Sequence, residues 1–543
     1  MLGLMQDWPL LVSKLIDHAA IFHGDQEIVT LPVEGGVHRY SWRDCHARSK
    51  KVAQALERMG VKEGDVIGTL AWNTYRHVEM WYGIAGMGAV AHTINPRLFR
   101  DQIIYIANHA EDKVLFLDLT FVPLIESFKD ELKTIEAYVI MTDRDHMPET
   151  RLENVLCYED LIDGEDGDYD WPQFDENTAA GLCYTSGTTG NPKGVLYSHR
   201  SNFLHTLVAT GADSAMKATA ADAILPVVPM FHANAWGVPY AAAAVGSKLV
   251  LNGANFEGEV LQKLIEDEKV TLTAAVPTVW LGLLAYLQSS GKRVDCLKRV
   301  AIGGSAAPRS MIQAFEDDYQ VEVIHAWGMT ETSPIGTVGT MTGVTAAYDR
   351  ERQLDVKCKQ GRPVVGIEMQ IQDDDGNPLP HDGKTFGHLM VRGPWVVSEY
   401  MKGEGGQILD KNGWFDTGDV STIDELGFMQ ITDRSKDVIK SGGEWISSIE
   451  LENAAVGHPD IAEAAVIGVF HPKWNERPLL IVVMVEGAEL DRDGVMSYLS
   501  SRVAKWWLPD DIVVVDELPH TATGKILKRA LRDQYAEYKL PTA

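Results

Sequence analysis

Cysteine is scarce in this chain, and its few cysteines lack the spacing of a metal site or a disulfide framework. Cys45, Cys157, Cys183, Cys296 and Cys358 are scattered over 543 residues, are odd in number and form no CxxC pair. Structural zinc sites and disulfide-rich domains both depend on paired cysteines, so neither class is indicated. Reduced thiols in a cytoplasmic protein are the simplest interpretation.

Long hydrophobic runs are also missing. No uninterrupted apolar run approaches the roughly 18 residues that a membrane helix needs. The first 20 residues carry Asp7, Lys14 and Asp17 among apolar neighbours, which predicts an amphipathic helix over 1–20 and not a signal peptide. We therefore expect no integral membrane segment, and contact with lipid only through a substrate.

Positive charge is in short supply as well. The chain has 49 lysines and arginines against 77 aspartates and glutamates, a formal net charge of −28 at pH 7. This balance argues against nucleic acid and against anionic membrane surfaces as partners. A protein of this charge that handles an anionic ligand must gather its positive charge locally.

Helical and strand-like segments alternate along most of the chain. A helix is predicted over 47–59, and short apolar runs at 65–70, 114–117 and 248–251 predict buried strands. The alternation favours an α/β architecture with largely parallel sheets, and the length suggests about three or four units.

A domain boundary is predicted near residue 434. The segment 434–440 is short and charged, which suits a hinge better than a packed core. Beyond it the pattern predicts a helix over 447–458, strands over 464–469 and 479–485, and a helix from 495 onward. We therefore expect an N-terminal region over 1–433, a hinge at 434–436 and a small domain over 437–543.

The most informative segment is YTSGTTGNPKG at 184–194, called here the Gly/Thr loop. Its glycines let the backbone approach a ligand, its hydroxyls add donors, and Lys193 adds a positive charge, a combination that suits a polyphosphate. It is not a Walker A loop, because Pro192 precedes the lysine and Gly194 follows it. The alternative is a flexible surface linker, which the closing Pro-Lys-Gly disfavours.

Further strings follow the loop in a fixed order. They are PMFHANAW at 229–236, GGSAAP at 303–308, WGMTET at 327–332, GWFDTGD at 413–419, Asp433-Arg434, KSGGEWI at 440–446 and PHTATGK at 519–525. With these strings the chain resembles, from about residue 30 to 535, the adenylate-forming superfamily of acyl-CoA synthetases, luciferases and peptide-synthetase adenylation domains. PMFHxNAW and SGGEWISS are most similar to bacterial medium- and long-chain fatty acyl-CoA synthetases and to 3-methylmercaptopropionate-CoA ligases.

The resemblance implies a fold and a reaction. The fold is a large N-terminal region of packed α/β subdomains plus a small mobile α+β C-terminal domain. The reaction is that of an ATP-dependent acyl-CoA ligase: an acid and ATP give acyl-AMP and pyrophosphate, and coenzyme A then gives acyl-CoA and AMP. The expected acid is a medium-chain fatty acid or a short thioether acid such as 3-methylmercaptopropionate. ATP or AMP, Mg²⁺ and coenzyme A are the expected ligands, and a homodimer is the expected assembly.

The resemblance also implies catalytic roles for Lys525, Thr330 and Glu331. Lys525 would swing in to offset charge on the substrate carboxylate and the α-phosphate, which Thr330 would also bond. Glu331 and Thr185 would hold Mg²⁺, which prefers oxygen ligands and usually bridges phosphates. The alternatives are a solvated lysine and a surface acid at a helix start.

The nucleotide and coenzyme A residues follow from the same motifs. Asp419 would accept from both ribose hydroxyls, with an Asx turn as the alternative. Trp327 would stack on adenine, although relatives more often carry tyrosine there. The glycines after the hinge would leave room for a pantetheine tunnel. The full cofactor-binding set is Thr185, Ser186, Gly187, Thr188, Thr189, Gly190, Lys193, Ser305, Ala306, Ala307, Pro308, Ala326, Trp327, Gly328, Met329, Thr330, Asp419, Arg434, Lys440, Gly442, Gly443 and Trp445.

The acyl group needs a separate pocket. The residues predicted for it are His232, Trp236, Gly303, Gly304 and Pro334, and the residue predicted for the hinge is Lys436. A lone histidine or tryptophan is more often core packing, and the shared motif of His232 and Trp236 favours the site. The sequence assigns no role to Trp395, which is bulky where many relatives are smaller.

Other functions share parts of this pattern. An adenylating enzyme that loads a carrier protein, an aryl-CoA ligase and a luciferase-type oxygenase all use the first half-reaction. A catalytically inactive nucleotide sensor is a further alternative, which the presence of Lys525, Glu331 and Asp419 disfavours.

Overall fold

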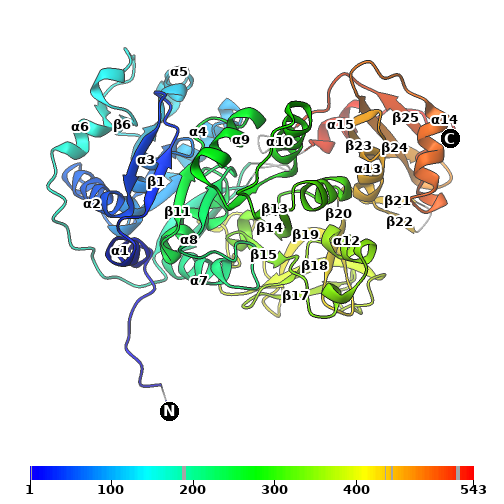
Figure 1. Cartoon of the computed structure of the whole chain (residues 1–543), viewed down its shortest axis with the longest axis horizontal. Helices are drawn as coiled ribbons and strands as arrows, with labels where there is room; N and C mark the ends of the chain where they lie inside the picture. The colour runs from blue at the N-terminus through cyan, green and yellow to red at the C-terminus, as the bar shows by residue number, and fades with distance from the viewer. Residues whose placement is uncertain (2, 186–190, 435, 442–443, 521–525) are drawn as a thin grey trace.

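The computed structural model describes residues 1, 3–185, 191–434, 436–441, 444–520 and 526–543. Within these ranges the strands form four sheets, of which two are large and mainly parallel. In Figure 1 the two parallel sheets form the blue-to-green body, a third sheet lies beside them in yellow, and the last forms an orange-to-red lobe. The α/β architecture predicted from the sequence is confirmed.

The first sheet carries the Gly/Thr loop between its last two strands. Its order is β7-β6-β5-β3-β4-β8-β9, and the pairings are parallel except between β8 and β9, where Tyr184 faces Gly194. The strands are β3 (Val66–Leu70), β4 (Val90–Thr93), β5 (Val114–Leu117), β6 (Ala137–Ile140), β7 (Val155–Cys157), β8 (Ala179–Tyr184) and β9 (Gly194–Ser198). Its helices are α2 (Trp42–Arg58), α3 (Tyr75–Gly86), α4 (Arg100–Ala110), α5 (Val122–Glu126) and α6 (Tyr158–Asp163).

The second sheet brings three of the sequence strings to one edge. Strands β14, β13, β12, β10, β11 and β1 pair in parallel, and β16, β15 and β2 add antiparallel ends. The strings at 229–236, 303–308 and 327–332 follow or end β10, β13 and β14, so they meet at the carboxyl edge of the parallel strands, where α/β sheets bind ligands. The strands are β1 (Glu27–Thr30), β2 (His38–Ser41), β10 (Ala223–Pro226), β11 (Lys248–Leu251), β12 (Leu272–Ala275), β13 (Arg299–Ile302), β14 (Glu322–Gly328), β15 (Ile335–Val338) and β16 (Arg362–Pro363), and the helices are α7 (His199–Thr210), α8 (Val238–Val245), α9 (Gly258–Glu268), α10 (Pro277–Ser290), α11 (Arg309–Gln313) and α12 (Arg350–Cys358).

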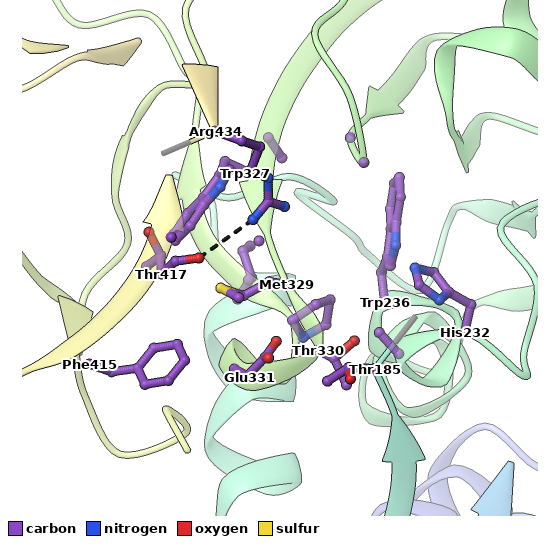
Figure 2. Close-up of a pocket in the computed structure, with 18 of the residues that line it drawn as sticks. Thr185, His232, Trp236, Trp327, Met329, Thr330, Glu331, Phe415, Thr417 and Arg434 are labelled. Atoms are coloured by element: carbon purple, nitrogen blue, oxygen red, sulfur yellow. Dashed lines mark hydrogen bonds between the residues drawn. The ribbon is translucent and has the colours of Figure 1, made fainter. Parts of the chain in front are cut away.

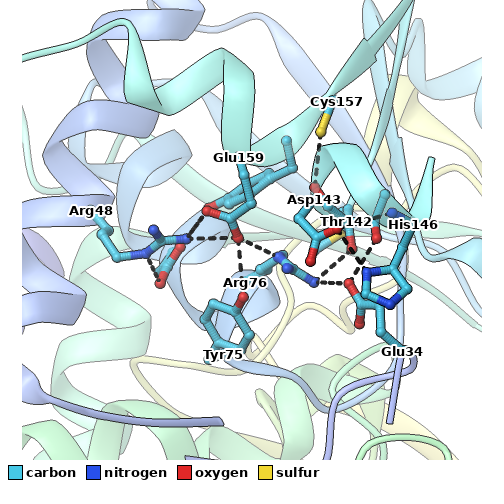
Figure 3. A network of polar contacts seen from close by, with 12 residues as sticks. Glu34, Arg48, Tyr75, Arg76, Thr142, Asp143, His146, Cys157 and Glu159 are labelled. Carbon is cyan, nitrogen blue, oxygen red and sulfur yellow. Dashed lines mark hydrogen bonds and ion pairs between the residues drawn. The ribbon is translucent and has the colours of Figure 1, made fainter.

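A shared apolar core and a network of buried charges hold the body together. One buried cluster contains residues of both parallel sheets. Beside it, Arg76 pairs with Glu34 at 2.6 Å and with Glu159 at 2.7 Å, and Arg48 pairs with Glu159 at 2.9 Å and with the fully buried Glu79 at 2.7 Å (Figure 3). Buried charges are tolerated only when paired in this way. The network therefore fixes α2, α3 and α6 relative to one another.

The last two sheets divide the chain where the sequence changes pattern. The third is antiparallel, with β17 (Glu368–Gln372), β18 (Phe386–Arg392), β19 (Phe415–Ile423) and β20 (Met429–Arg434). The fourth has its own apolar clusters and contains β21 (Ile439–Ser441), β22 (Glu444–Ile446), β23 (Ile461–His471), β24 (Asn475–Met484) and β25 (Asp511–Val514). Its helices are α13 (Ser448–Val456), α14 (Arg492–Ser500) and α15 (Lys528–Gln534).

The N-terminal prediction is wrong in its first half. Helix α1 spans Ser13–Phe22, and residues 3–8 form an exposed arm that leaves the body in Figure 1, whereas Leu11 and Val12 are buried just before the helix. Pro9 explains the difference, because it lacks an N–H and disfavours helical geometry in the residue before it. In the described part of the chain no helix is long and apolar enough to cross a membrane. All five cysteines are described and are free thiols.

Candidate active site

A cavity of about 560 Å³ lies where the parallel sheets, the third sheet and the C-terminal lobe meet. Figure 2 shows Trp327 and Arg434 at one side of it, Trp236 and His232 at the other, and Glu331 between them. The predicted residues that line the cavity are Thr185, Lys193, His232, Trp236, Gly303, Gly304, Ala326, Trp327, Gly328, Met329, Thr330, Glu331, Pro334, Arg434 and Lys436. Segments far apart in sequence therefore converge on one site.

Other predicted residues lie elsewhere. The cavity lining does not include Ser305, Ala306, Ala307, Pro308, Asp419 or Lys440, all of which are described. Asp419 is buried behind the wall, and Lys440 is exposed on β21. Ser186, Gly187, Thr188, Thr189, Gly190, Gly442, Gly443 and Lys525, together with the side chain of Trp445, lie outside the described residues.

A tight turn after β14 presents Glu331. The 3-10 turn Thr330–Thr332 follows the strand directly, and the Tyr197 hydroxyl donates to the Thr330 carbonyl at 2.8 Å. Glu331 is 8% exposed, and burial raises the pKa of its carboxyl, while a hydrogen bond from the Tyr400 hydroxyl at 2.8 Å acts in the opposite direction. The turn therefore holds an acidic oxygen ligand at the edge of the cavity.

The ends of the Gly/Thr loop are closed by two hydrogen bonds. The Thr185 N–H donates to the Lys193 carbonyl at 2.9 Å, and the Lys193 N–H donates to the Thr185 hydroxyl at 3.0 Å. The Lys193 ammonium lies 4.9 Å from the centre of the Tyr400 ring. The loop thus returns its lysine to the cavity beside Glu331.

The Trp327 indole has a partner that the sequence did not reveal. Its N–H donates to one oxygen of Asp419 at 2.9 Å, and Arg434 Nε lies 2.8 Å from the other oxygen. Asp419 is 1% exposed, so one hydrogen bond from the indole and one ion pair with the guanidinium compensate its burial. Trp327, which stands where relatives more often carry tyrosine, therefore holds this carboxylate through its indole N–H.

The end of the cavity beside Trp236 is lined mainly by small apolar residues. Trp236 belongs to a 3-10 turn (Ala233–Gly237) in which every residue has positive φ, a conformation that costs about 1–2 kcal/mol per non-glycine residue. Asn73 anchors the preceding segment through bonds to the Pro226 and Val228 carbonyls and from the Met230 N–H. The lining residues that sequence reasoning missed here are Ala209, Ala215, Met216, Val238, Ala274 and Ala301.

Positive charge gathers at the polar end despite the acidic composition. The cationic lining residues are Lys193, Arg434, Lys436, Lys528, Arg529 and Arg532, and the acidic ones are Glu331, Asp416 and Asp437. Sequence reasoning missed the three cations of α15, which follow the Thr-Gly-Lys string by a few residues. Arg434, Lys528 and Arg532 already form ion pairs with Asp419, Glu452 and Asp437. A polyphosphate ligand would share these cations with their present partners.

The donor set fits a magnesium ion that is held mainly by phosphates. Among the described residues no group of three His, Cys, Asp or Glu side chains could hold a metal. Glu331 and Thr185 supply a carboxylate and a hydroxyl in the same cavity. Mg²⁺ commonly takes one or two protein oxygens and completes its shell with water and phosphate.

Comparison with known proteins defines the class. Residues 16–401 match the model of the AMP-binding enzyme family, and residues 450–525 match that of the AMP-binding enzyme C-terminal domain. The chain therefore belongs to the AMP-binding enzyme family, among the acid–thiol ligases that form acyl-CoA. The family implies ATP or AMP, coenzyme A and a small acid as its ligands.

Particular relatives cover the whole chain. A 3-methylmercaptopropionyl-CoA ligase of Ruegeria lacuscaerulensis is 50% identical over 537 residues, 99% of each chain. A medium-chain-fatty-acid–CoA ligase of Ectopseudomonas oleovorans is 49% identical over 540 residues, 99% of this chain and 98% of the relative. The crystal structure of an anthranilate CoA ligase with anthranoyl-AMP is 25% identical with a TM-score of 0.86, covering 98% of this chain and 99% of the other.

Proposed function

We propose that this chain converts a medium-chain fatty acid or a short thioether acid such as 3-methylmercaptopropionate into its CoA thioester. The observation that carries the proposal is one cavity with a cationic end and an apolar end lined by small residues. The first suits ATP, and the second suits an unbranched acyl chain. The names of the two full-length relatives support the same acids.

In the first half-reaction a carboxylate attacks the α-phosphate, and the enzyme must offset negative charge and fix an in-line approach. The Gly/Thr loop and Lys193 would hold the β- and γ-phosphates, and Thr330 the α-phosphate. Glu331, with Thr185, would hold Mg²⁺, which supplies charge neutralisation when bound. Asp419 would accept from the ribose hydroxyls only after Arg434, which lines the cavity in front of it, releases the oxygen with which it is paired.

The C-terminal lobe would serve both half-reactions. We assign residues 1–433 to the nucleotide and acyl domain, 434–436 to the hinge and 437–543 to the mobile domain. Ile526 and Leu527, which follow Lys525 directly, line the cavity, and this placement supports delivery of Lys525 to the adenylation site. Lys440, Gly442, Gly443 and Trp445 would line the pantetheine tunnel after rotation.

Two further proposals concern the cellular location and the oligomeric state of the protein. Five free thiols support a cytoplasmic enzyme. A homodimer is proposed on the resemblance to fatty acyl-CoA synthetases alone.

Pyrophosphate release with ATP and Mg²⁺, measured with and without coenzyme A, tests the activity. The acids are acetate, octanoate, palmitate, 3-methylmercaptopropionate and cinnamate. A maximum at octanoate or 3-methylmercaptopropionate, with an acyl-CoA product, is expected. A maximum at cinnamate would favour an aryl-CoA ligase, and release that never becomes dependent on coenzyme A would favour a carrier-protein acceptor.

Lys525→Ala should reduce adenylation by about a thousandfold, because it removes charge that offsets the transition state. ATP binding should stay within about twofold, since the phosphate loop and Glu331 are unchanged. Acyl-adenylate formation in single turnovers is the measurement. Lys539→Ala, an exposed lysine of the same domain, is the control, and near-normal adenylate formation by the Lys525 variant would refute the role.

A further inference from the structure

The segment 395–405 packs against the turn Thr330–Thr332, which carries Glu331. The Val397 N–H donates to the Glu331 carbonyl at 2.8 Å, and the Ser333 hydroxyl donates to the Trp395 carbonyl at 2.8 Å. The Trp395 indole N–H in turn donates to the Ile335 carbonyl at 2.9 Å. Residues 395–405, called here the brace, therefore determine where the turn after β14 sits. This contact also gives a structural role to the bulk of Trp395.

The same segment reaches the phosphate loop. Tyr400 is 8% exposed and lines the cavity with its hydroxyl on Glu331 Oε1 at 2.8 Å and its ring 4.9 Å from Lys193 Nζ. Further along the brace, a Cβ on Gly405 would lie 3.0 Å from Lys193 Nζ. The backbone of Gly405 has φ +78°, which favours glycine, and any side chain there would crowd the tip of Lys193. The brace thus contacts both the cation and the acid.

Lys193 and Glu331 carry opposite charges in one cavity but do not pair. Both are described, no ion pair joins them, and Tyr400 contacts each of them. A direct ion pair between them would leave neither the ammonium nor the carboxylate available to a ligand. The aromatic ring offers the ammonium a weaker, cation–π partner, and the hydroxyl occupies only one carboxylate oxygen.

We infer that Tyr400 is a positioning residue that keeps Lys193 and Glu331 apart and orients each toward its own ligand. The hydroxyl fixes Glu331 through Oε1 and leaves Oε2 for the divalent cation. The ring directs Lys193 toward the phosphates. This inference rests on the proposed function, because it assigns the metal and the phosphates to this cavity.

Two variants separate the hydroxyl from the ring. Tyr400→Phe removes only the donor to Glu331, and Tyr400→Leu removes the ring as well. Mn²⁺ binding to the complex with α,β-methylene-ATP, followed by electron paramagnetic resonance, reports the metal ligand without turnover. Binding of the same analogue in EDTA reports the phosphate contacts alone.

Tyr400→Phe should weaken Mn²⁺ binding about tenfold, as expected for loss of a hydrogen bond to a charged group, and leave metal-free analogue binding within about twofold. Tyr400→Leu should weaken both, because Lys193 is then free to pair with Glu331. Tyr169→Phe is the matched control, since the Tyr169 hydroxyl donates to the Glu57 carboxylate at 2.7 Å on an exposed surface. It should change neither binding constant.

The outcomes separate this inference from the proposed function. A wild type that releases no pyrophosphate with any acid would overturn the proposed function. An active wild type whose Mn²⁺ affinity is unchanged or increased in Tyr400→Phe would overturn only the role of Tyr400. Equal weakening by Tyr169→Phe would overturn it as well, because the effect would then not be local.

Discussion

Gly303 sets the width of the cavity next to Trp236. A Cβ at this position would lie 3.2 Å from the Trp236 ring and 3.3 Å from the Ala326 carbonyl oxygen. Both contacts are tight, so a neighbour would have to give by a few tenths of an ångström to admit the methyl group. A single methyl group at this glycine therefore takes space from the apolar end.

Gly303→Ala should shift acid preference toward shorter chains. We expect kcat/KM for octanoate to fall about tenfold relative to that for butyrate, because one methylene in an apolar pocket is worth about 1–3 kcal/mol. Pyrophosphate release over a series of straight-chain acids measures the ratio. Gly282→Ala, in helix α10 with nothing within 4 Å of the added Cβ, should leave it unchanged. An unaltered ratio in the Gly303 variant would place the acyl chain elsewhere.

Residues with distinctive chemistry could be predicted from the sequence, and residues defined by packing could not. Thr330, Glu331 and Trp236 lie in strings whose order points to a ligand, and the structure places them on one cavity. Tyr400 and Ala301 also line it, but an isolated tyrosine and an alanine in a buried strand look like ordinary core residues. Their roles depend on contacts with residues about 70 or more positions away, such as the bond from Tyr400 to Glu331.

At the scale of elements, Asp118 joins the ends of two parallel strands. It follows β5, and its Oδ2 accepts a hydrogen bond at 2.7 Å from the N–H of Trp72, just beyond β3. Burial raises the pKa of this carboxyl to about 7. The folded protein thus keeps the proton up to about pH 7, whereas an unfolded aspartate releases it near pH 3.9.

The contribution of Asp118 to stability should therefore fall as pH rises from about 4 to about 7. The folded state binds more protons than the unfolded state in this window, so the free energy of unfolding decreases by up to about 1.4 kcal/mol per pH unit. Asp118→Asn removes the titration and should gain stability relative to the wild type over the same range. Urea unfolding at pH 5, 6, 7 and 8 measures the difference. If the free energies of unfolding of the wild type and Asp118→Asn differ by the same amount at every pH, the raised pKa of Asp118 is contradicted. Asp170→Asn, at an exposed position, is the control.

At the scale of the whole molecule, two structural units contribute to one cavity. Arg434 closes the third sheet, Ile439 opens the fourth, and both Arg434 and Arg529 of α15 line the cavity. A change of pattern near residue 434 could be expected from the short charged segment there, whereas the division into domains and a hinge stays a prediction. The inward-facing cations of α15 could not be expected, because their orientation depends on how the lobe docks. In this arrangement the face of the lobe that carries α15 lines the cavity.

A second face of the same lobe should serve thioester formation. Gly442 and Gly443 lie outside the described residues, between β21 and β22, and the resemblance assigns them to the pantetheine tunnel. Gly442→Leu should leave acyl-adenylate formation within about twofold and reduce acyl-CoA formation at least about a hundredfold, because a branched side chain would fill the channel that the resemblance implies there.

Rapid-quench measurement of each half-reaction separates the two effects. Ala462→Leu, which adds bulk at an exposed position of β23, should slow neither step. Equal loss of both steps in the Gly442 variant would mean that the segment supports the adenylating arrangement itself. In this structure the face of the lobe that carries α15 lines the cavity. If the Gly442 variant loses only acyl-CoA formation, the lobe must turn a different face toward the cavity for that step.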